Sequence, residues 1–458
     1  MADVGRSLIS YSRIAVTGIL ILTPWAWGGI PEWTFSWLNV ALLGAVFLWV
    51  AGYALHQRTP HVPLVVRLCV GFLLVQGWIL IANAQYSYDR KQLRFHETDA
   101  FLTGRWAPGA LDIEDAMPVM LRITGLLGML CMVCGMVRHP IWRRRLLWAT
   151  TGTTLSLAVY GIAERVLNLP LLFYLNTDRT GNVFASFFYH GNSGAFINLS
   201  IPAIAGLTLL AFRTRNADLQ RAVLIVSLVL MLSASVLIAS KATMVVTLIL
   251  CVATGLAFRR QLPRMPRISI LGTAGVALLA LAGILLLGFD RASERWNALP
   301  ELLTLENTRF KIWTACLRML PDAGPWGIGP GNFAIAFPHY THGLGINEGL
   351  TDACQDYLQT TIEWGWIGFL VWGILVIGGF RNSMTVPNPR SSAITMDEVI
   401  RISSSLALAG VLLHSLVDFP LQVPAIQLYA TVHLGILWAT PFPKTAFKGE
   451  ESGFVTKC

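Results

Sequence analysis

The sequence predicts an all-α polytopic membrane protein with about twelve transmembrane helices and one large extracytoplasmic loop containing short helices. Of its 458 residues, 54% are apolar and only 13% are charged, and the mean hydropathy is +0.59, a balance that soluble globular proteins do not show. Apolar runs of about 17 to 25 residues, each able to cross roughly 30 Å of hydrocarbon as a helix, recur along the chain. The expected spans are 14–30, 35–55, 63–83, 117–137, 144–163, 193–212, 222–239, 242–258, 268–289, 363–380, 399–417 and 422–440.

The first of these spans has a competing interpretation as a cleaved signal peptide, because Arg6 and Arg13 come before or within the start of an apolar stretch. That stretch is long, carries Trp25 and Trp27 near its end, and lacks a small-residue cleavage site. We therefore expect it to be retained as a membrane helix.

Orientation follows from the basic residues, because Lys and Arg in short loops stay on the cytoplasmic side. With the N-terminus inside, most of them fall in inner loops, so both termini are expected in the cytoplasm. The chain then divides into nine helices over 1–289, a large periplasmic loop over 290–362, and three further helices with a cytoplasmic tail over 363–458. Shorter outer segments are expected at 84–116 and 164–192.

Net charge and cysteine content point to the membrane rather than to other partners. The net charge of +9 is spread over loops as topology determinants and contacts for anionic membrane lipids, so no nucleic-acid partner is expected. Cys131 and Cys134 form a CxxC inside a predicted span, where packing is expected. Cys316 and Cys354 share the large loop, where a disulfide and two separate thiols both stay open.

The large loop contains two predicted helical pieces. In the first, apolar side chains recur every three or four residues and basic ones project elsewhere, the pattern of a helix lying on the membrane interface. The second starts at Asp352, with Gln355 as its capping-box partner, and places Asp356, Gln359 and Glu363 on one polar stripe that continues into the tenth span. The apolar residues of the first piece are Phe310, Trp313, Leu317 and Leu320, and Pro321 is expected to end it.

Three alternating glycines in the loop resemble a nucleotide-binding loop only superficially. No hydrophobic strand precedes Gly327, Gly329 and Gly331, and prolines at 325 and 330 break the segment. A tight turn is expected instead. The chain also has no Asp-x-Asp pair or His cluster, so neither a metal nor another cofactor is expected.

Several short motifs carry a family resemblance. The loop contains Arg309-x-x-x-Trp313, Pro325-x-Gly-x-Gly-x-Gly-Asn-Phe333, Asp356-Tyr-Leu-Gln359 and Glu363-x-Gly365-x-x-Gly368, and segments 184–192, 240–241 and 414–422 follow a matching order. This series resembles bacterial O-antigen ligases and the related O-antigen and exopolysaccharide polymerases.

The resemblance implies a multi-pass glycosyltransferase of the bacterial inner membrane. Its donor would be a glycan linked to polyprenyl diphosphate, such as undecaprenyl diphosphate, and its acceptor a saccharide or lipid. The enzyme would polymerise or ligate saccharide units at the periplasmic face without a metal, in O-antigen, lipopolysaccharide or exopolysaccharide assembly. Ligase and polymerase share donor and loop, but the Phe-Pro-His-Tyr and Glu-Trp-Gly-Trp-Ile-Gly sequences are more similar to exopolysaccharide polymerases.

One position departs from the family pattern. Members of the family usually have a catalytic His two residues before the Asp-Tyr-Leu-Gln motif, where this chain has Cys354. A thiol does not simply replace an imidazole as general base, since its unperturbed pKa is about 8.5. Three explanations stay open: His339 or His342 supplies the imidazole, Asp356 or Glu363 acts as base, or the protein has diverged and is inactive.

The departing diphosphate of such a reaction requires positive charge. Lys241, at the outer end of a helical hairpin, and Arg309, which matches the loop arginine of the family, are the first candidates, followed by Arg179. Each has a plainer alternative. Lys241 can snorkel to the interface, Arg309 can contact a phospholipid headgroup, and Arg179 can be a solvated loop residue.

Polar residues near helix ends are candidates for glycan binding. His190 and Asn192 open the sixth span, where they either contact sugar hydroxyls or cap the helix. Asp418 lies beyond the eleventh span with His414 one turn before it, so Asp418 either contacts glycan or forms an ion pair that stabilises the bundle.

A transporter is the main rival class, for a lipid-linked or anionic solute. Its signs would be inverted repeats, Gly- or Pro-broken helices in both halves, and ionisable residues near the middle of the bilayer. The charges of this chain instead cluster at helix ends and in one large loop. A purely structural role is the third alternative.

Overall fold

The computed structural model describes residues 1–57, 59–89, 94–98, 108–167, 183–212, 218–259, 308–346, 351–385 and 395–442. The predicted span 268–289 and Arg179 lie outside these residues. Within them the fold is almost wholly helical, with one antiparallel pair of strands, β1 (Tyr86–Asp89) and β2 (Arg94–Glu97). The helices are α1 (Ala2–Trp25), α2 (Glu32–His56), α3 (Leu64–Ala82), α4 (Ile113–Met136), α5 (Pro140–Val166), α6 (His190–Asn198), α7 (Ile201–Ala211), α8 (Asp218–Leu237), α9 (Lys241–Phe258), α12 (Thr308–Ala323), α13 (Phe333–Ala336), α14 (Asp356–Met384), α15 (Met396–His414) and α16 (Pro424–Trp438), with short 3-10 turns η1 (Trp27–Gly29), η4 (Phe337–Tyr340) and η5 (Pro420–Gln422).

The predicted class, a multi-pass α-helical membrane protein, is confirmed. Nine segments among the described residues are long and apolar enough to cross a membrane, with α6 and α7 counted together as one. Helices α15 and α16 overlap the predicted spans 399–417 and 422–440 but are not among the nine. The number twelve and a large extracytoplasmic loop therefore stay predictions.

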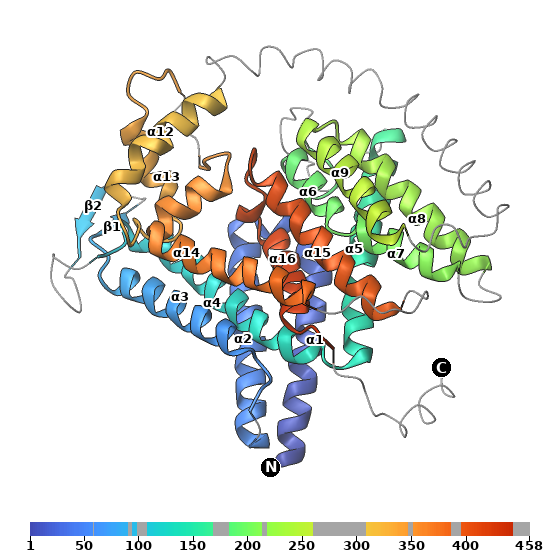
Figure 1. Ribbon diagram of the computed structural model, residues 1–458. Helices are drawn as coiled ribbons and strands as arrows, with labels where there is room; N and C mark the ends of the chain where they lie inside the picture. The colour runs from blue at the N-terminus through green and yellow to red at the C-terminus, as the bar shows by residue number, and fades with distance from the viewer. Residues whose placement is uncertain are drawn as a thin grey trace.

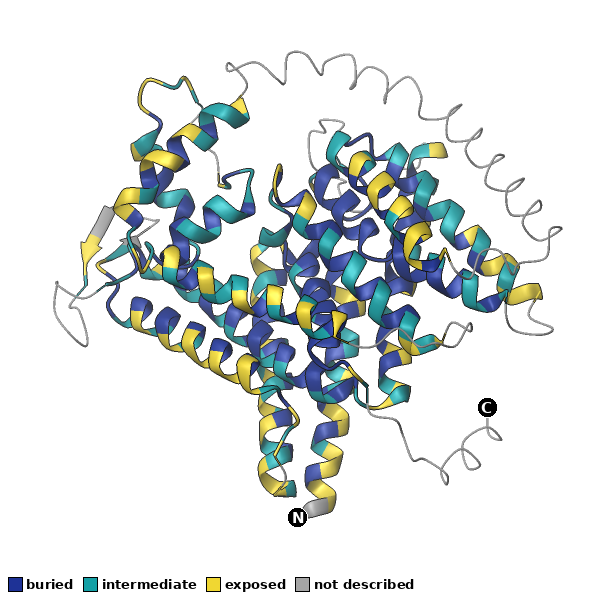
Figure 2. Ribbon diagram, viewed as in Figure 1, coloured by how far each residue is buried: buried dark blue, intermediate teal, exposed yellow. Residues whose placement is uncertain are grey.

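Figure 1 shows α12 and α13 at one end of the bundle, which we call the loop end, and the N-terminus at the opposite end. Helices α4, α6 and α16 are mostly buried inside the bundle, whereas α2, α8 and α9 turn exposed faces outward (Figure 2). Large apolar side chains stand on those faces; Val40, Phe47 and Leu219 are 73%, 71% and 80% exposed. Such a surface is costly in water but suits contact with lipid.

The predicted span 193–212 forms two helices instead of one. Helix α6 ends at Asn198 and α7 starts at Ile201, with Pro202 in its first turn. Proline is favoured there because it has no N–H to donate. The Ser200 hydroxyl in the break lies 2.9 Å from the Thr154 hydroxyl of α5, so a buried side-chain contact accompanies the interruption.

Helix α14 is broken at Gly365, where φ is 66° and ψ is 174°. The glycine turn docks into this break: Gly329 N–H donates to the Glu363 carbonyl at 3.0 Å, and Ile367 N–H donates to the Pro325 carbonyl at 3.2 Å. A Cβ on Gly327 would stand 2.3 Å from the Glu363 carbonyl oxygen, so only glycine permits this approach. The expected turn is present, and it fixes the loop to the membrane helix.

Helix α12 differs in two ways from the predicted interfacial helix. Pro321 lies inside its last turn, because the helix continues to Ala323. Its buried face carries Ile312, Cys316 and Met319, whereas Leu317 is 58% exposed. This face packs on the loop's own small core with Phe333 and Phe337. Of the apolar stripe predicted from the sequence, Trp313 and Leu320 are partly buried against this core, whereas Leu317 is not, because the helix packs on neighbouring loop segments.

Candidate active site

Four polar side chains form a connected cluster at the loop end. The Tyr189 hydroxyl lies 3.2 Å from Asp418 Oδ2, and Arg309 Nη2 lies 3.2 Å from the same hydroxyl and 3.7 Å from Asp418 Oδ2. Arg309 Nη1 also donates to the Val417 carbonyl. On the other side, His414 Nε2 lies 3.7 Å from Asp418 Oδ2. The structure thus brings together Arg309, Asp418 and His414, and adds Tyr189.

Each member of this cluster comes from a different element. Arg309 stands in the first turn of α12, Tyr189 directly precedes α6, His414 ends α15, and Asp418 follows in the turn before η5. The Tyr189 ring is held between two neighbours: it stacks on Phe419 at 5.5 Å and meets the His190 ring edge-on at 4.7 Å. The direction of its hydroxyl is therefore fixed by packing.

The charges of the cluster support one another. Burial alone would raise the pKa of Asp418, but the interactions with His414 and Arg309 bring it below its ordinary value. Burial alone would lower the pKa of Arg309, and the charge of Asp418 raises it instead. Burial and the charge of Asp418 raise the pKa of the Tyr189 phenol. At neutral pH the cluster therefore holds a carboxylate, a guanidinium and a protonated phenol.

Cys354 is electrostatically coupled to this cluster but is a poor base. Burial raises the pKa of its thiol to about 11; Arg309 opposes this rise, and Asp418 and Asp352 add to it. Burial raises the pKa of Cys316 to about 12. Both are free thiols, so of the two alternatives for this pair, the structure has no disulfide between them.

Asp356 is held in place by three donors. Its carboxylate is 1% exposed and accepts from Ser415 Oγ at 2.7 Å, from Leu421 N–H at 2.9 Å and from Gln422 Nε2 at 3.0 Å. Its own N–H donates to the Ser415 carbonyl at 3.2 Å. These bonds tie the start of α14 to the turn that carries Asp418. The arrangement suits a structural anchor better than a free base.

Glu363 lies in a second buried polar group, which includes a cation that the sequence analysis missed. It accepts from Gln359 Nε2 at 3.3 Å and from the Gly331 backbone, and it interacts with Arg122 of α4. Arg122 is 5% exposed, stacks over the Phe35 ring at 4.5 Å, and its Nε makes no hydrogen bond within the described part of the chain. A basic residue inside an apolar run was the available signal.

His339 and His342 lie toward the other end of α12. His342 accepts through its backbone carbonyl from Arg318 Nη1 at 3.2 Å, and His339 stands in the adjoining η4. Arg318 is nine residues along α12 from Arg309, about 13 Å at 1.5 Å per residue. No contact in the described residues joins either imidazole to the Arg309 cluster, so their catalytic role stays a prediction.

Lys241 and the start of α6 lie on the same side of the bundle. Helices α6 and α9 run alongside each other with Gly194 against Thr243, and Asn198 Nδ2 donates to the Thr243 carbonyl at 3.3 Å. Lys241 at the first turn of α9 is therefore near the level of Asn192. The buried Asn192 is 2% exposed, and its Oδ1 makes no hydrogen bond with the described residues.

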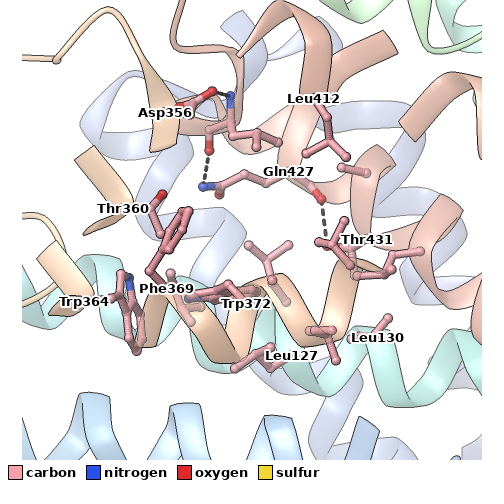
Figure 3. A pocket seen from close by; sticks show the side chains of 18 of the residues that line it. Leu127, Leu130, Asp356, Thr360, Trp364, Phe369, Trp372, Leu412, Gln427 and Thr431 are labelled. Carbon is pink, nitrogen blue, oxygen red and sulfur yellow. Dashed lines mark hydrogen bonds between the residues drawn. The ribbon is translucent and has the colours of Figure 1, made fainter. Parts of the chain in front are cut away.

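A cavity of about 780 Å³ lies between α4, α14, α15 and α16 (Figure 3). Leucines and tryptophans such as Leu127 and Trp372 dominate its lining, which follows α14 from Asp356 to Arg381. After the break at Gly365, the lining still follows about 24 Å of helix at 1.5 Å per residue, most of the roughly 30 Å of a bilayer core. Its polar end, near Asp356, adjoins the turn that carries Asp418. The described residues contain no group of three His, Cys, Asp or Glu side chains arranged to hold a metal.

Comparison with known proteins supports one family. A search of curated proteins gives no significant match. The family model described as O-antigen ligase matches residues 226–373, which include α9, α12, the glycine turn and the first half of α14. Arg309, Cys354, Asp356 and Glu363 lie inside the match, whereas Tyr189 and Asp418 lie outside it. This match confirms the resemblance carried by the motifs: residues 226–373, about a third of the chain, are similar to the O-antigen ligase family.

Proposed function

We propose that the protein is a membrane glycosyltransferase that moves saccharide units from polyprenyl diphosphate to a saccharide or lipid acceptor at the periplasmic face of a bacterial inner membrane. The observation that carries the proposal is the Arg309 cluster, in which Arg309 from the family region meets Tyr189 and Asp418 close to the polar end of an apolar cavity. The proposal includes both termini in the cytoplasm and residues 290–362 as the periplasmic loop between helices 1–9 and 10–12.

The cations would act on the leaving group. Breaking the bond between the anomeric carbon and the diphosphate puts negative charge on a phosphate oxygen, and no metal is needed where guanidinium and ammonium groups supply the charge. Arg309 is the main candidate because its side chain is 36% exposed and presents a planar fork of donors. Lys241 would add a point charge from the start of α9, and Arg179 is retained as a further candidate.

The cavity would hold part of the lipid. Its volume falls in the range of about 300–1,000 Å³ typical of small-molecule sites, so it suits a segment of a long hydrocarbon chain. The sugars would then lie toward His190 and Asn192, at the start of α6. Asp418 would act through Arg309 and Tyr189, with which it is in contact.

Among the activities of the family, we favour polymerisation over ligation. The Phe337-Pro-His-Tyr340 and Glu363-Trp-Gly-Trp-Ile-Gly368 segments are more similar to exopolysaccharide polymerases. A polymerase should lengthen a lipid-linked oligosaccharide when no other acceptor is present. A ligase should leave it unchanged until a lipid acceptor is added.

The test is a reconstituted transfer assay with the full chain in lipid nanodiscs and a polyprenyl-diphosphate-linked oligosaccharide. Wild type should give longer glycans and free polyprenyl diphosphate without added metal and in the presence of a chelator. Arg309→Lys should weaken donor binding, because the bidentate fork is lost, whereas Arg318→Lys on the same helix should not. Accumulation of a solute inside energised vesicles, with no glycan product, would instead favour a transporter.

A further inference from the structure

Tyr189 lies where the proposed reaction could use a proton acceptor. The acceptor hydroxyl that attacks the anomeric carbon needs a base beside it. At the position of the family imidazole this chain has Cys354, whose thiol is protonated at neutral pH because burial raises its pKa to about 11. Asp356 already accepts three hydrogen bonds that tie it to the turn before α16. The Tyr189 phenol is also protonated at neutral pH, but its hydroxyl donates to the Asp418 carboxylate at 3.2 Å. It can therefore accept a proton from the acceptor while it passes its own proton to Asp418.

We propose that Tyr189, Asp418 and His414 form a proton relay, in which Tyr189 is the catalytic residue that takes the acceptor proton. Asp418 and His414 are positioning residues that act through it. The proposal rests on the glycosyltransferase function proposed above, and it assigns a base within that reaction.

The contacts give the relay a direction. The Tyr189 hydroxyl lies between Asp418 Oδ2 and Arg309 Nη2, at 3.2 Å from each. Because a guanidinium only donates, the phenol oxygen accepts from Arg309, and its proton points to the carboxylate. Asp418 and His414 are both buried, so the contacts run from the half-buried phenol to a buried carboxylate and then to a buried imidazole.

Within the described part of the chain, the contact with Asp418 is the one polar contact recorded for the His414 ring. Neither of its ring nitrogens makes a hydrogen bond there, and the nearest charge is Asp418 at 3.7 Å. An imidazole buried in this way is costly unless a charged partner faces it. The interaction with His414 lowers the pKa of Asp418, so it favours the ionised carboxylate that can accept a proton.

The atoms balance in a single displacement. The acceptor hydroxyl gives its proton to Tyr189 Oη while Tyr189 gives its own proton to Asp418 Oδ2. The acceptor oxygen bonds to the anomeric carbon, and the bond from that carbon to the diphosphate oxygen breaks. The oxygen keeps the electron pair beside Arg309, and the proton on Asp418 returns to water through Tyr189 after the products leave.

The decisive experiment compares two tyrosines that each donate to an aspartate. Tyr189→Phe should lower kcat by about 10²-fold or more, within the usual contribution of general acid–base catalysis, and leave the Kd of the polyprenyl-diphosphate donor unchanged. Tyr340→Phe, which removes a 2.8 Å hydrogen bond to Asp322 elsewhere in the loop, should leave kcat unchanged. Wild-type kcat in Tyr189→Phe would overturn the relay, as would a loss confined to donor binding.

A rescue separates chemistry from folding. Because Cys354 is coupled to the same cluster, Cys354→His should restore turnover to Tyr189→Phe, and Cys354→Ala should not. If the double variant Tyr189→Phe, Cys354→His is as slow as Tyr189→Phe alone, an imidazole at position 354 does not replace the Tyr189 phenol as proton acceptor, and the relay is contradicted. If wild type itself transfers no glycan, the proposed function fails first; an active wild type with an equally active Tyr189→Phe refutes only the relay.

The pH profile tests the positioning residues. The relay needs ionised Asp418, and the interaction with His414 lowers the pKa of that carboxyl. His414→Gln should therefore move the acidic limb of kcat to higher pH. A merely structural role would lower kcat at all pH values without moving that limb, which would overturn the role of His414. Among the described residues, the titratable and charged groups that interact with Asp418 are Arg309, Tyr189, His414, Cys354, Asp352 and Asp356.

Discussion

Replacing Asp356 with alanine should destabilise the protein strongly, although this residue carries no proposed chemistry. The carboxylate is 1% exposed and accepts three hydrogen bonds. Asp356→Ala leaves all three donors without their acceptor. One of them, the Leu421 N–H, is fixed in the backbone and cannot turn to another partner.

The magnitude follows from the fate of each donor. A buried donor without an acceptor costs about 1–3 kcal/mol. The Leu421 N–H should bear that cost fully, whereas the Ser415 hydroxyl can rotate and Gln422, which is half-buried, can reach water. The sum is about 3–5 kcal/mol, a large part of the roughly 5–15 kcal/mol that stabilises a typical protein. Asp356→Asn keeps one oxygen as acceptor and should lose less.

The assay is denaturation by sodium dodecyl sulfate in mixed micelles, which gives the free energy of unfolding of a helical membrane protein. The matched control is Asp322→Ala, since Asp322 is exposed and accepts a single hydrogen bond from Tyr340 at 2.8 Å. Its loss should cost less than about 1 kcal/mol. If Asp356→Ala unfolds with the same free energy as Asp322→Ala, the anchoring role assigned to this carboxylate is refuted.

Three further outcomes follow from the packing and charges. A Cβ on Gly194 would stand 1.9 Å from Thr243 Oγ1, so Gly194→Ala should cost about 1–3 kcal/mol in the same micelle assay, whereas Gly152→Ala meets nothing within 4 Å and should not destabilise. A variant with Cys354 as its only cysteine should react with maleimide at pH 7.5 about 10²-fold more slowly than a free thiol, because a pKa of about 11 leaves little thiolate; labelling at the rate of a free thiol would contradict this burial. The folded state lowers the pKa of Asp418, so its ionised carboxylate should stabilise the protein above the unfolded pKa of about 3.9. This contribution is lost as the pH falls through the folded pKa. Asp418→Asn should therefore be less stable than wild type at pH 6, and the difference should shrink toward pH 3.

The membrane helices could be predicted from sequence because one physical requirement determines them. A run of about 20 apolar residues can satisfy its backbone hydrogen bonds in lipid only as a helix. The predicted spans therefore agree with the ends of α2 to α5, α8 and α9 within a few residues. Helix α1 is the exception, because it begins about a dozen residues before the predicted span. The break between α6 and α7 was missed. Pro202 was visible in the sequence, but a proline in a membrane helix is often tolerated, and only the packing partner of the break decides its effect.

The loop was harder to predict because its helices pack on one another. The face of α12 that contacts Phe333 and Phe337 is set by loop segments distant in sequence, and no periodicity reveals such a partner. The same limit explains Tyr189. Its segment was recognised through His190 and Asn192, but the contact with Arg309 joins residues 120 positions apart, which spacing along one helix cannot show.

The turn between α15 and α16 has a role that its sequence alone does not show. Ser415, Leu421 and Gln422 bind Asp356, and Asp418 between them faces Tyr189 and Arg309. One short segment therefore fixes the polar end of the apolar cavity and the carboxylate of the Arg309 cluster at the same time. A lipid in the cavity and a sugar at Tyr189 would be placed relative to each other by this turn. A substitution that disturbs this turn should therefore lower both the free energy of unfolding and kcat, whereas a substitution elsewhere should be able to change one without the other.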